Sequence, residues 1–377
     1  MKRPVRFVEL AVPMLAVSAL VAACSSSSSS SSAPSSSPGA SSGSGTPSST
    51  PAGPAPGAKV SGTLNGSGST FQKAYNDQVV TTFDQKNSGA TINYQAKGSG
   101  AGQTDLQNGV VDFAGSDVLV KAADVSKFKG GDLLYFPTIS GPITVSYKLS
   151  GVSSLQLSAT SLAKIFSRMA KTWDDPAIKA DNPGASLPST PIVVAHRSDA
   201  SGTTANFTSF LKKADPTDWT LGSATTVQWA PDTQGGTGNN GVAQIVKNTD
   251  GAIGYVDYSD AKVAGLVFAK VRNAGGRYVT ATLDGASEAV KNATVAANLT
   301  YDPINAPGDA SYPITSPTYI ITYAKYTDAS KVALLKAFLS YIEGPEGQAA
   351  AKDVDFAALP SDLAQKALAQ AGQITAG

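Results

Sequence analysis

From residue 59 to the C-terminus, short apolar strands alternate with amphipathic helices, and glycine-rich turns join them. This alternation is typical of an α/β fold. Predicted strands at 60–64, 91–96 and 110–114 each end in a turn of small residues with hydroxyl or carboxylate groups. Ligands bind beyond the carboxyl ends of the strands in open α/β sheets, so the sequence predicts a ligand site where these turns converge.

A second region of the same kind extends from about residue 143 to residue 310. It contains a predicted strand at 192–195, a polar run at 196–204 and then a helix. Nearer the C-terminus, the sequence predicts a strand at 319–323 and a helix at 331–342. This last helix has no obvious partner of its own size, so we expect it to return and complete the first domain.

The polar run at 196–204 has the composition of an anion site. Arg197 can donate a charged, bidentate pair of hydrogen bonds. Residues 201–203 open a helix, whose free N–H groups and partial positive charge favour an oxyanion. Asp199 would repel a fully ionised anion, but it can accept a hydrogen bond from an anion that still carries a proton. Phosphate carries protons at neutral pH, whereas sulfate carries none.

The same interpretation applies to Asp117, which follows the third predicted strand. It should lie where the first two glycine-rich turns converge. Thr70 and Ser99 offer hydroxyl groups there, and Phe71 offers a backbone N–H. Fixed neutral donors of this kind stabilise a buried anion. Together, the two parts of the sequence predict a pocket for a protonated oxyanion.

Composition excludes several other functions. The 29 Lys and Arg residues balance 28 Asp and Glu residues, so no broad basic surface is left for nucleic-acid phosphates. One Cys and one His cannot build a disulfide framework or a Cys/His zinc site. We therefore expect no metal, no cofactor and no nucleic-acid partner.

The N-terminal segment is not expected to belong to the fold. Basic residues precede an apolar stretch at 10–23, which is too short to span a bilayer comfortably. Small residues then precede Cys24, and this arrangement resembles the lipobox of bacterial lipoproteins. The resemblance implies a signal peptide at 1–23, acylation of Cys24 (palmitate) and anchoring to the cell membrane. The alternative is an ordinary secreted protein with a free thiol.

The region 24–58, which is almost entirely Ser, Thr, Pro, Gly and Ala, is predicted to be a disordered tether.

Five motifs resemble, in order and spacing, those of the phosphate-binding proteins of bacterial phosphate-specific ABC transporters. They are 67–71, 93–95 with 98–100, 111–117, 196–204, and 238–243 before Gly254 and Tyr255. The resemblance implies an α/β, two-lobed periplasmic-binding-protein fold (type II) with the ligand in the cleft between the lobes. The phosphate ligands that it implies are Thr70, Phe71, Ser99, Asp117, Arg197, Asp199, Ser201, Gly202 and Thr203.

The resemblance also implies a domain arrangement and a role. Residues 59–140 and 315–377 would form lobe I, and residues 141–314 would form lobe II. The chain would cross between the lobes at two hinges, near 140–141 and 314–316. The protein would be an extracytoplasmic monomer that captures phosphate with high affinity and delivers it to the permease subunits of an ABC transporter. It would not be an enzyme.

Two other functions stay open. The same fold could bind another tetrahedral oxyanion, such as sulfate. A secreted hydrolase that uses Ser201 and His196 is a more distant alternative, because no Gly-x-Ser-x-Gly elbow is present. A phosphatase would need a metal cluster that one His can hardly supply. His196 is predicted to be structural, and Tyr255, Tyr258 and Trp229 are predicted to be core or lobe-surface residues.

Overall fold

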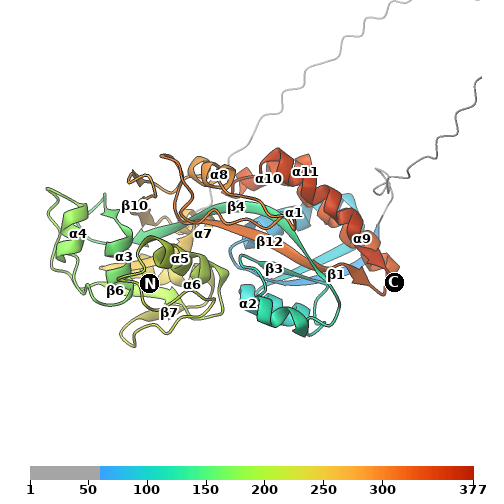
Figure 1. Cartoon of the computed structure of the whole chain (residues 1–377), viewed down its shortest axis with the longest axis horizontal. Coiled ribbons are helices and arrows are strands. Elements are labelled where there is room, and N and C mark those ends of the chain that lie inside the picture. The colour runs from blue at the N-terminus through green and yellow to red at the C-terminus, as the bar shows by residue number, and fades with distance from the viewer. Residues whose placement is uncertain (1–59) are drawn as a thin grey trace, which may run out of the picture. The chain divides into compact units, whose positions relative to one another are not determined.

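The structure of the protein is a computed structural model that describes residues 60–377 (Figure 1). The predicted signal peptide, the acylation site Cys24 and the predicted tether lie outside the described residues. Within 60–377, no helix combines the length and the apolar character needed to cross a bilayer.

A mixed sheet forms the centre of the described chain. Its strands are β1 (Ser61–Gly68), β2 (Gly89–Ala96), β3 (Phe113–Ser116), β4 (Leu133–Tyr147), β6 (Val193–Arg197), β7 (Gln234–Gly236), β8 (Ala252–Asp257), β9 (Val267–Phe268) and β12 (Thr315–Tyr323). They follow the order β2-β1-β3-β12-β4-β8-β6-β7, with β9 paired to β4. Two small sheets hold the short strands β5 (Gln156–Leu157), β10 (Lys270–Arg272), β11 (Tyr278–Val279), β13 (Lys325–Tyr326) and β14 (Thr375–Ala376).

We call β1, β2 and β3, with the helices that pack on them, the first lobe. α1 (Lys73–Lys86), α2 (Ser99–Gln107) and α9 (Ala329–Glu343) contact these strands, while α10 (Pro345–Asp353) and α11 (Ser361–Gln370) pack on α9 and β4 and complete the lobe. β1 pairs in parallel with β2 and with β3. α9 packs on β1 although it comes from the end of the chain, and its Phe338 ring contacts Phe83 of α1 and Phe113 of β3. The predicted helix at 331–342 is thus confirmed.

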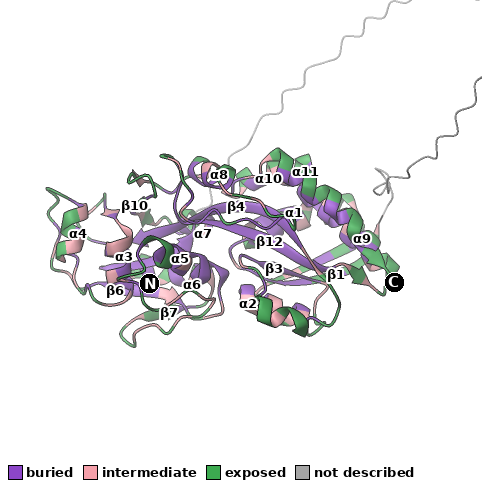
Figure 2. Cartoon of the chain, viewed as in Figure 1, coloured by how far each residue is buried: buried purple, intermediate pink, exposed green. Residues whose placement is uncertain are grey.

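The packing of α1 follows from its apolar pattern. Tyr75, Val79 and Phe83 recur at helical spacing and are buried against the sheet. Figure 2 shows the same division in α9 and α11, with buried residues on the inner side and exposed residues on the outer side. β3 begins at Phe113, later than predicted, because residues 110–112 form the turn after α2.

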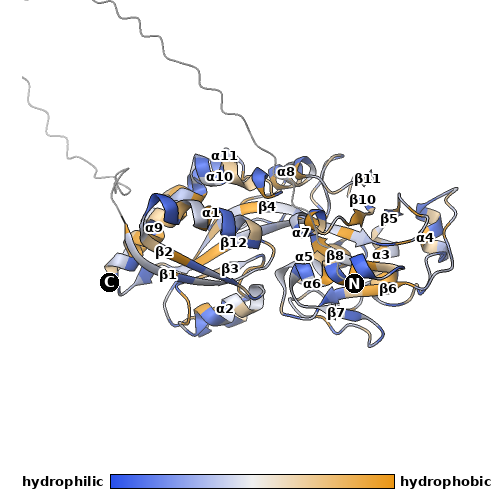
Figure 3. Ribbon diagram, turned by 180° about the vertical axis from the view of Figure 1, so that it is seen from behind, coloured by the Kyte–Doolittle hydropathy of each residue, from blue (hydrophilic) through white to orange (hydrophobic). Residues whose placement is uncertain are grey.

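We call β6, β7 and β8, with the helices around them, the second lobe. These helices are α3 (Ala159–Phe166), α4 (Pro176–Asp181), α5 (Gly202–Ala214), α6 (Gly238–Asn248) and α7 (Tyr258–Val263). β6 lies between β7 and β8 and is parallel to both. Figure 3 shows strongly apolar stretches on β6 and β8 inside the lobe. The remaining helices are α8 (Leu283–Lys291), which packs on β4 and β12, η1 (Ala122–Lys127) and η2 (Ala371–Gln373).

Two long antiparallel strands connect the lobes. β12 pairs with β4 along its whole length, while β12 also pairs with β3 and β4 also pairs with β8. Gly141 of β4 pairs with Ser316 of β12, so the two segments predicted as crossovers lie side by side. Their role as hinges stays a prediction.

Candidate functional site

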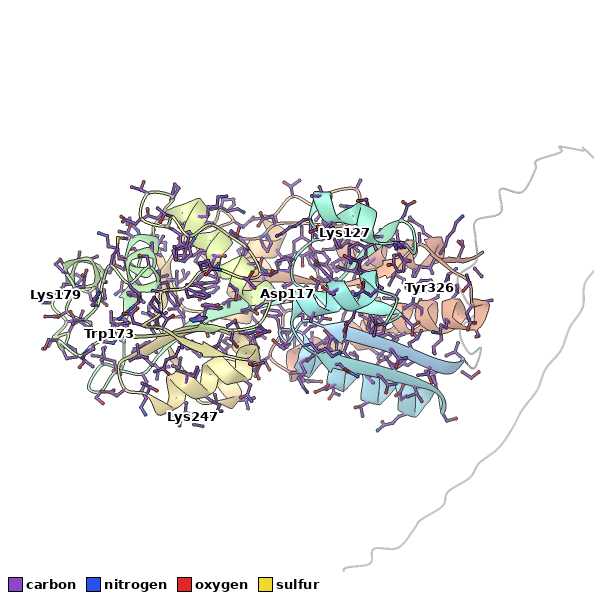
Figure 4. All side chains as sticks on the ribbon, turned by 90° about the horizontal axis from the view of Figure 1, so that it is seen from below. Asp117, Lys127, Trp173, Lys179, Lys247 and Tyr326 are labelled. Carbon is purple, nitrogen blue, oxygen red and sulfur yellow. The ribbon has the colours of Figure 1, made fainter. Side chains whose placement is uncertain are left out.

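Asp117 lies in the turn after β3, between the two lobes (Figure 4). It is only 2% exposed, and three hydroxyl groups donate hydrogen bonds to its carboxylate. Ser69 Oγ lies 2.6 Å from Oδ1 and 2.7 Å from Oδ2. Thr318 Oγ1 of β12 lies 2.7 Å from Oδ1, and Ser99 Oγ, at the start of α2, lies 3.2 Å from Oδ2.

Burial raises the pKa of Asp117 to about 6, although its three hydroxyl donors and the positive charge of Arg197 oppose the rise. The carboxyl group is therefore mostly ionised at neutral pH. An ionised carboxylate can only accept hydrogen bonds, so this side chain suits a ligand that brings a proton into the cleft.

Arg197 ends β6 and points into the same region, with a side chain that is 1% exposed. Its Nε lies 2.7 Å from Oδ1 of Asp199, and its Nη2 donates to Oδ2 of the same carboxylate. Its Nη1 lies 3.5 Å from Thr203 Oγ1. The Arg197–Asp199 pair is bidentate, a geometry that holds the guanidinium in a fixed plane.

Asp199 also accepts a hydrogen bond from the backbone N–H of Gly238 at 3.0 Å. Burial acts to raise the pKa of Asp199, but its pairing with Arg197 outweighs burial, so the pKa lies below its usual value. The sequence interpretation gave Asp199 the same role as Asp117, that of accepting a hydrogen from the ligand. In the structure, Arg197 occupies both of its oxygens, so the two carboxylates have different surroundings.

The N-terminus of α5 lies next to both Asp117 and Arg197. Ser201 caps the helix through its Oγ, which accepts the N–H of Thr204 at 3.2 Å, and its own N–H donates to Thr225 O. Gly202 is the first helical residue. A Cβ atom at Gly202 would lie 2.5 Å from Ser99 Oγ and 2.6 Å from Asp117 Cβ, so only glycine lets the helix approach the first lobe this closely.

The turn after β1 supplies the remaining predicted residues. Thr70 Oγ1 accepts a hydrogen bond from Asn239 Nδ2 at 3.2 Å, and the same amide donates to Thr203 Oγ1 at 3.2 Å. The N–H of Phe71, predicted to serve the ligand, donates to Ser69 Oγ at 3.0 Å. The ring of Phe71 is buried in the core.

All nine predicted residues therefore converge on one region, and further contacts join the lobes beside them. The N–H of Gly100 donates to Ala200 O at 3.0 Å, and Asn206 Nδ2 donates to Asp117 O at 2.9 Å. Next to Thr70, a cavity of about 440 Å³ lies between α1 and α7. Thr70 and Phe71 line this cavity, so it borders the site.

Sequence reasoning missed four residues of this network, namely Ser69, Asn206, Asn239 and Thr318. Ser69 stands inside a motif that the sequence analysis singled out, and its position directly before Thr70 could have drawn attention to it. Thr318 lies within a buried strand, and nothing in the local sequence marks it.

His196 and Tyr255 are structural, as predicted. His196 stacks on Trp229 with ring centroids 5.0 Å apart, and its Nδ1 lies 2.9 Å from Arg197 O. Tyr255 is fully buried, and its hydroxyl group accepts the N–H of Arg197 at 3.0 Å. Ser201 Oγ is engaged as a helix cap rather than with His196. Across residues 60–377, no three His, Cys, Asp or Glu side chains gather in a way that could hold a metal ion.

An α/β fold of two lobes with an arginine, a helix N-terminus and a buried carboxylate between them is the architecture of a substrate-binding protein for a small anion.

Comparison with known proteins agrees. A family model of the PBP superfamily domain matches residues 53–346. The phosphate-binding protein PstS3 of Mycobacterium bovis (strain BCG / Pasteur 1173P2) is 37% identical over 313 residues, which cover 80% of this chain and 84% of that protein. The phosphate-binding protein PstS of Pasteurella multocida is 35% identical, covering 82% of this chain and 89% of that protein. The chain belongs to the PBP superfamily and, within it, to the PstS phosphate-binding proteins.

Solved structures agree on the fold. A high affinity periplasmic phosphate-binding protein (PfluDING) with bound phosphate has a TM-score of 0.68 and 24% identity, covering 81% of this chain and 92% of that one. A phosphate-binding protein from Stenotrophomonas maltophilia has a TM-score of 0.64 and 21% identity, covering 82% of this chain and 94% of that one. The predicted two-lobed periplasmic-binding-protein fold is confirmed.

Proposed function

We propose that this protein binds inorganic phosphate outside the cytoplasm and delivers it to the permease of an ABC importer. The observation that carries the proposal is the buried carboxylate of Asp117, which accepts three hydroxyl hydrogen bonds and lies between Arg197 and the N-terminus of α5 on one side and the first lobe on the other. The cation and the helix attract an anion, while the carboxylate accepts a hydrogen bond only from an anion that keeps a proton. The names of the curated relatives support the same ligand.

The proposed ligand set keeps all nine predicted residues, with distinct roles. Arg197 would donate to phosphate oxygens, and Asp199 would hold the guanidinium in place. Gly202 and Thr203 would offer N–H groups of α5, and Asp117 would accept the phosphate proton. The other donors in this proposal are the Thr70 hydroxyl group and the Ser99 backbone N–H. Phe71 and Ser201 complete the set by orienting Ser69 and by capping α5.

The domain boundaries belong to the same proposal. Residues 59–140 and 315–377 would move as one lobe and residues 141–314 as the other, about hinges near 140–141 and 314–316. Phosphate would favour the arrangement in which residues of both lobes reach it together. The protein would act as a monomer that releases phosphate unchanged, without covalent chemistry.

Calorimetry with phosphate and with sulfate tests the ligand. We expect the protein to bind phosphate tightly and sulfate at least about 100-fold more weakly, because the ionised Asp117 repels an anion that has no proton to share. Titrations of both anions into the same sample at neutral pH measure this ratio. Equal affinity for the two anions would contradict the proposed role of Asp117 and would favour a general oxyanion-binding protein.

Membrane anchoring forms a separate part of the proposal. The lipobox-like sequence predicts that Cys24 is acylated, and two or more acyl chains give stable anchoring. A Cys24→Ala chain is therefore expected to leave the membrane fraction and appear in the medium, while its affinity for phosphate stays unchanged. Fractionation of cells that express either chain, with labelling by a radioactive fatty acid, measures both effects. A Cys24→Ala chain that still sediments with membranes would rule out the lipid anchor.

A further inference from the structure

Two of the three hydroxyl groups around Asp117 are oriented by the backbone. Ser69 Oγ accepts the N–H of Phe71 at 3.0 Å, and Ser99 Oγ accepts the N–H of Asp117 itself at 3.2 Å. A hydroxyl group has a single proton. Because each of these oxygens already receives an N–H, its proton is free to point at the carboxylate. Both hydroxyls are thereby fixed as donors to Asp117.

The third hydroxyl, that of Thr318, is oriented by a side chain instead. Gln72 Nε2 donates to Thr318 Oγ1 at 2.7 Å, and Thr318 Oγ1 donates to Asp117 Oδ1 at 2.7 Å. Gln72 Nε2 also donates to Tyr319 O at 3.2 Å. A carbonyl oxygen only accepts, so the nitrogen of the amide must face β12. Asn76 Nδ2 donates to Gln72 Oε1 at 3.0 Å and holds the other end of the amide.

The packing leaves space for this amide and for little else. Gln72 and Thr318 are fully buried. Gly115 of β3 lies beside them, and a Cβ atom there would come within 2.1 Å of Tyr94 Oη and 2.9 Å of Gln72 Nε2. The absence of a side chain at Gly115 therefore makes room for the Gln72 amide next to β12.

We propose that Gln72 is a positioning residue for phosphate recognition, which acts through Thr318 to keep Asp117 an acceptor of the phosphate proton. This inference rests on the proposed function. Without the amide, the Thr318 hydroxyl is free to turn its proton toward other oxygens, and Asp117 loses part of the support for its charge. A protonated Asp117 would carry an O–H group of its own. Two O–H donors would then face each other, and the hydrogen bond from phosphate to Asp117 would be lost.

The pH range of the effect follows from the groups around Asp117. Burial raises its pKa to about 6 against the pull of its three hydroxyl donors. The charged or titratable groups that face it are the Arg197–Asp199 pair of the second lobe and Tyr94 of β2. Burial raises the pKa of Tyr94 well above its usual value, so it stays neutral. The protonation of Asp117 is therefore the change expected near pH 6.

A glutamine-to-methionine substitution at Gln72 tests the proposal, because it keeps the length of the side chain and removes the amide. Phosphate affinity is measured by calorimetry from about pH 5.5 to about pH 8.5 and divided by the wild-type value at each pH, which cancels the titration of phosphate itself. We expect the affinity of Gln72→Met to fall about threefold near pH 6.5 and about eightfold near pH 5.5, and to stay within about twofold at pH 8.5. The apparent pKa of binding would move upward by about one unit.

Substitutions at Thr318 separate this role from simple packing. Thr318→Val removes the hydroxyl and should show the same shift, whereas Thr318→Ser keeps it and should restore the wild-type profile. Thr322→Val on the same strand is the matched control, because Thr322 is equally buried and its hydroxyl has no hydrogen-bond partner within residues 60–377. Its profile should coincide with that of the wild type.

Carbon-13 NMR of the Asp117 carboxyl group, without phosphate, measures the pKa directly. It should rise by about one unit in Gln72→Met and in Thr318→Val. If both variants keep the wild-type pKa and pH profile, or if Thr318→Ser shifts as far as Thr318→Val, the relay is wrong while the proposed function stands. A wild-type protein that binds no phosphate at any pH overturns the proposed function and the relay with it.

Discussion

Replacing Arg197 with alanine is expected to weaken phosphate binding about 1000-fold or more. Each hydrogen bond to a charged group contributes about 1.5 to 3 kcal/mol, and tenfold in affinity corresponds to about 1.4 kcal/mol. The substitution also leaves the Asp199 carboxylate, which Arg197 holds through both oxygens, as an unpaired negative charge facing the ligand. Calorimetry with phosphate at neutral pH measures the loss.

Two further variants give this prediction its controls. Arg168→Ala removes another arginine of the second lobe, which is mostly buried and pairs with the exposed Asp232, and its affinity should match the wild type. Arg197→Ala combined with Asp199→Asn should bind more tightly than Arg197→Ala alone, because the uncompensated charge is gone. An Arg197→Ala protein that binds within tenfold of the wild type would remove Arg197 from the proposed ligand set.

Replacing Gly202 with valine is expected to weaken phosphate binding about 100-fold, an effect of about 3 kcal/mol. The added Cβ would lie 2.5 Å from Ser99 Oγ and 2.6 Å from Asp117 Cβ, so the N-terminus of α5 could not come close to the first lobe. The fold of each lobe should persist, because the clash arises only between them. Small-angle scattering with and without phosphate, together with calorimetry, measures closure and affinity separately.

Gly372→Ala is the matched control for Gly202→Val, because a Cβ atom at Gly372 meets no atom within 4 Å. It should bind phosphate and become compact like the wild type. A Gly202→Val protein that still compacts with phosphate and keeps its affinity would show that the lobes need not meet at α5.

The parts of the site that the sequence predicted are those with a local signature. α5 begins where residues 201–203 predicted a helix N-terminus, since the hydroxyl group of a serine cap accepts one of the free N–H groups at the start of a helix. Asp117 was found because it follows a strand in a small-residue turn. In both cases the local sequence marks the residue, although the partners of Asp117 come from distant parts of the chain.

Residues that act through distant partners could not be predicted in this way. Thr318 and Asp117 are separated by 201 positions in the sequence, and only the pairing of β12 with β3 and β4 brings them together. Asp199 posed the opposite problem. Its partner Arg197 is only two positions away. The sequence alone, however, does not show whether the two side chains pair with each other or each contact the ligand.

The sequence analysis also did not predict β4 as one continuous strand. Pro137, Gly141 and Pro142 interrupt its apolar pattern, and proline removes a backbone donor from the ladder. The structure accommodates Pro137 through an irregular register opposite Thr318 and Tyr319. Tertiary pairing therefore decides the course of this strand.

The position of α9 on β1 has a consequence for how the protein is made. The strands β1, β2 and β3 are synthesised before the other strands, but the face of β1 on which α9 packs stays uncovered until residues 329–343 have been made. The second lobe is complete earlier, because its strands and helices are close together in the sequence. The half of the protein that is synthesised first is thus the last to mature, and its exposed apolar surface is the one that chaperones would need to shield in the meantime.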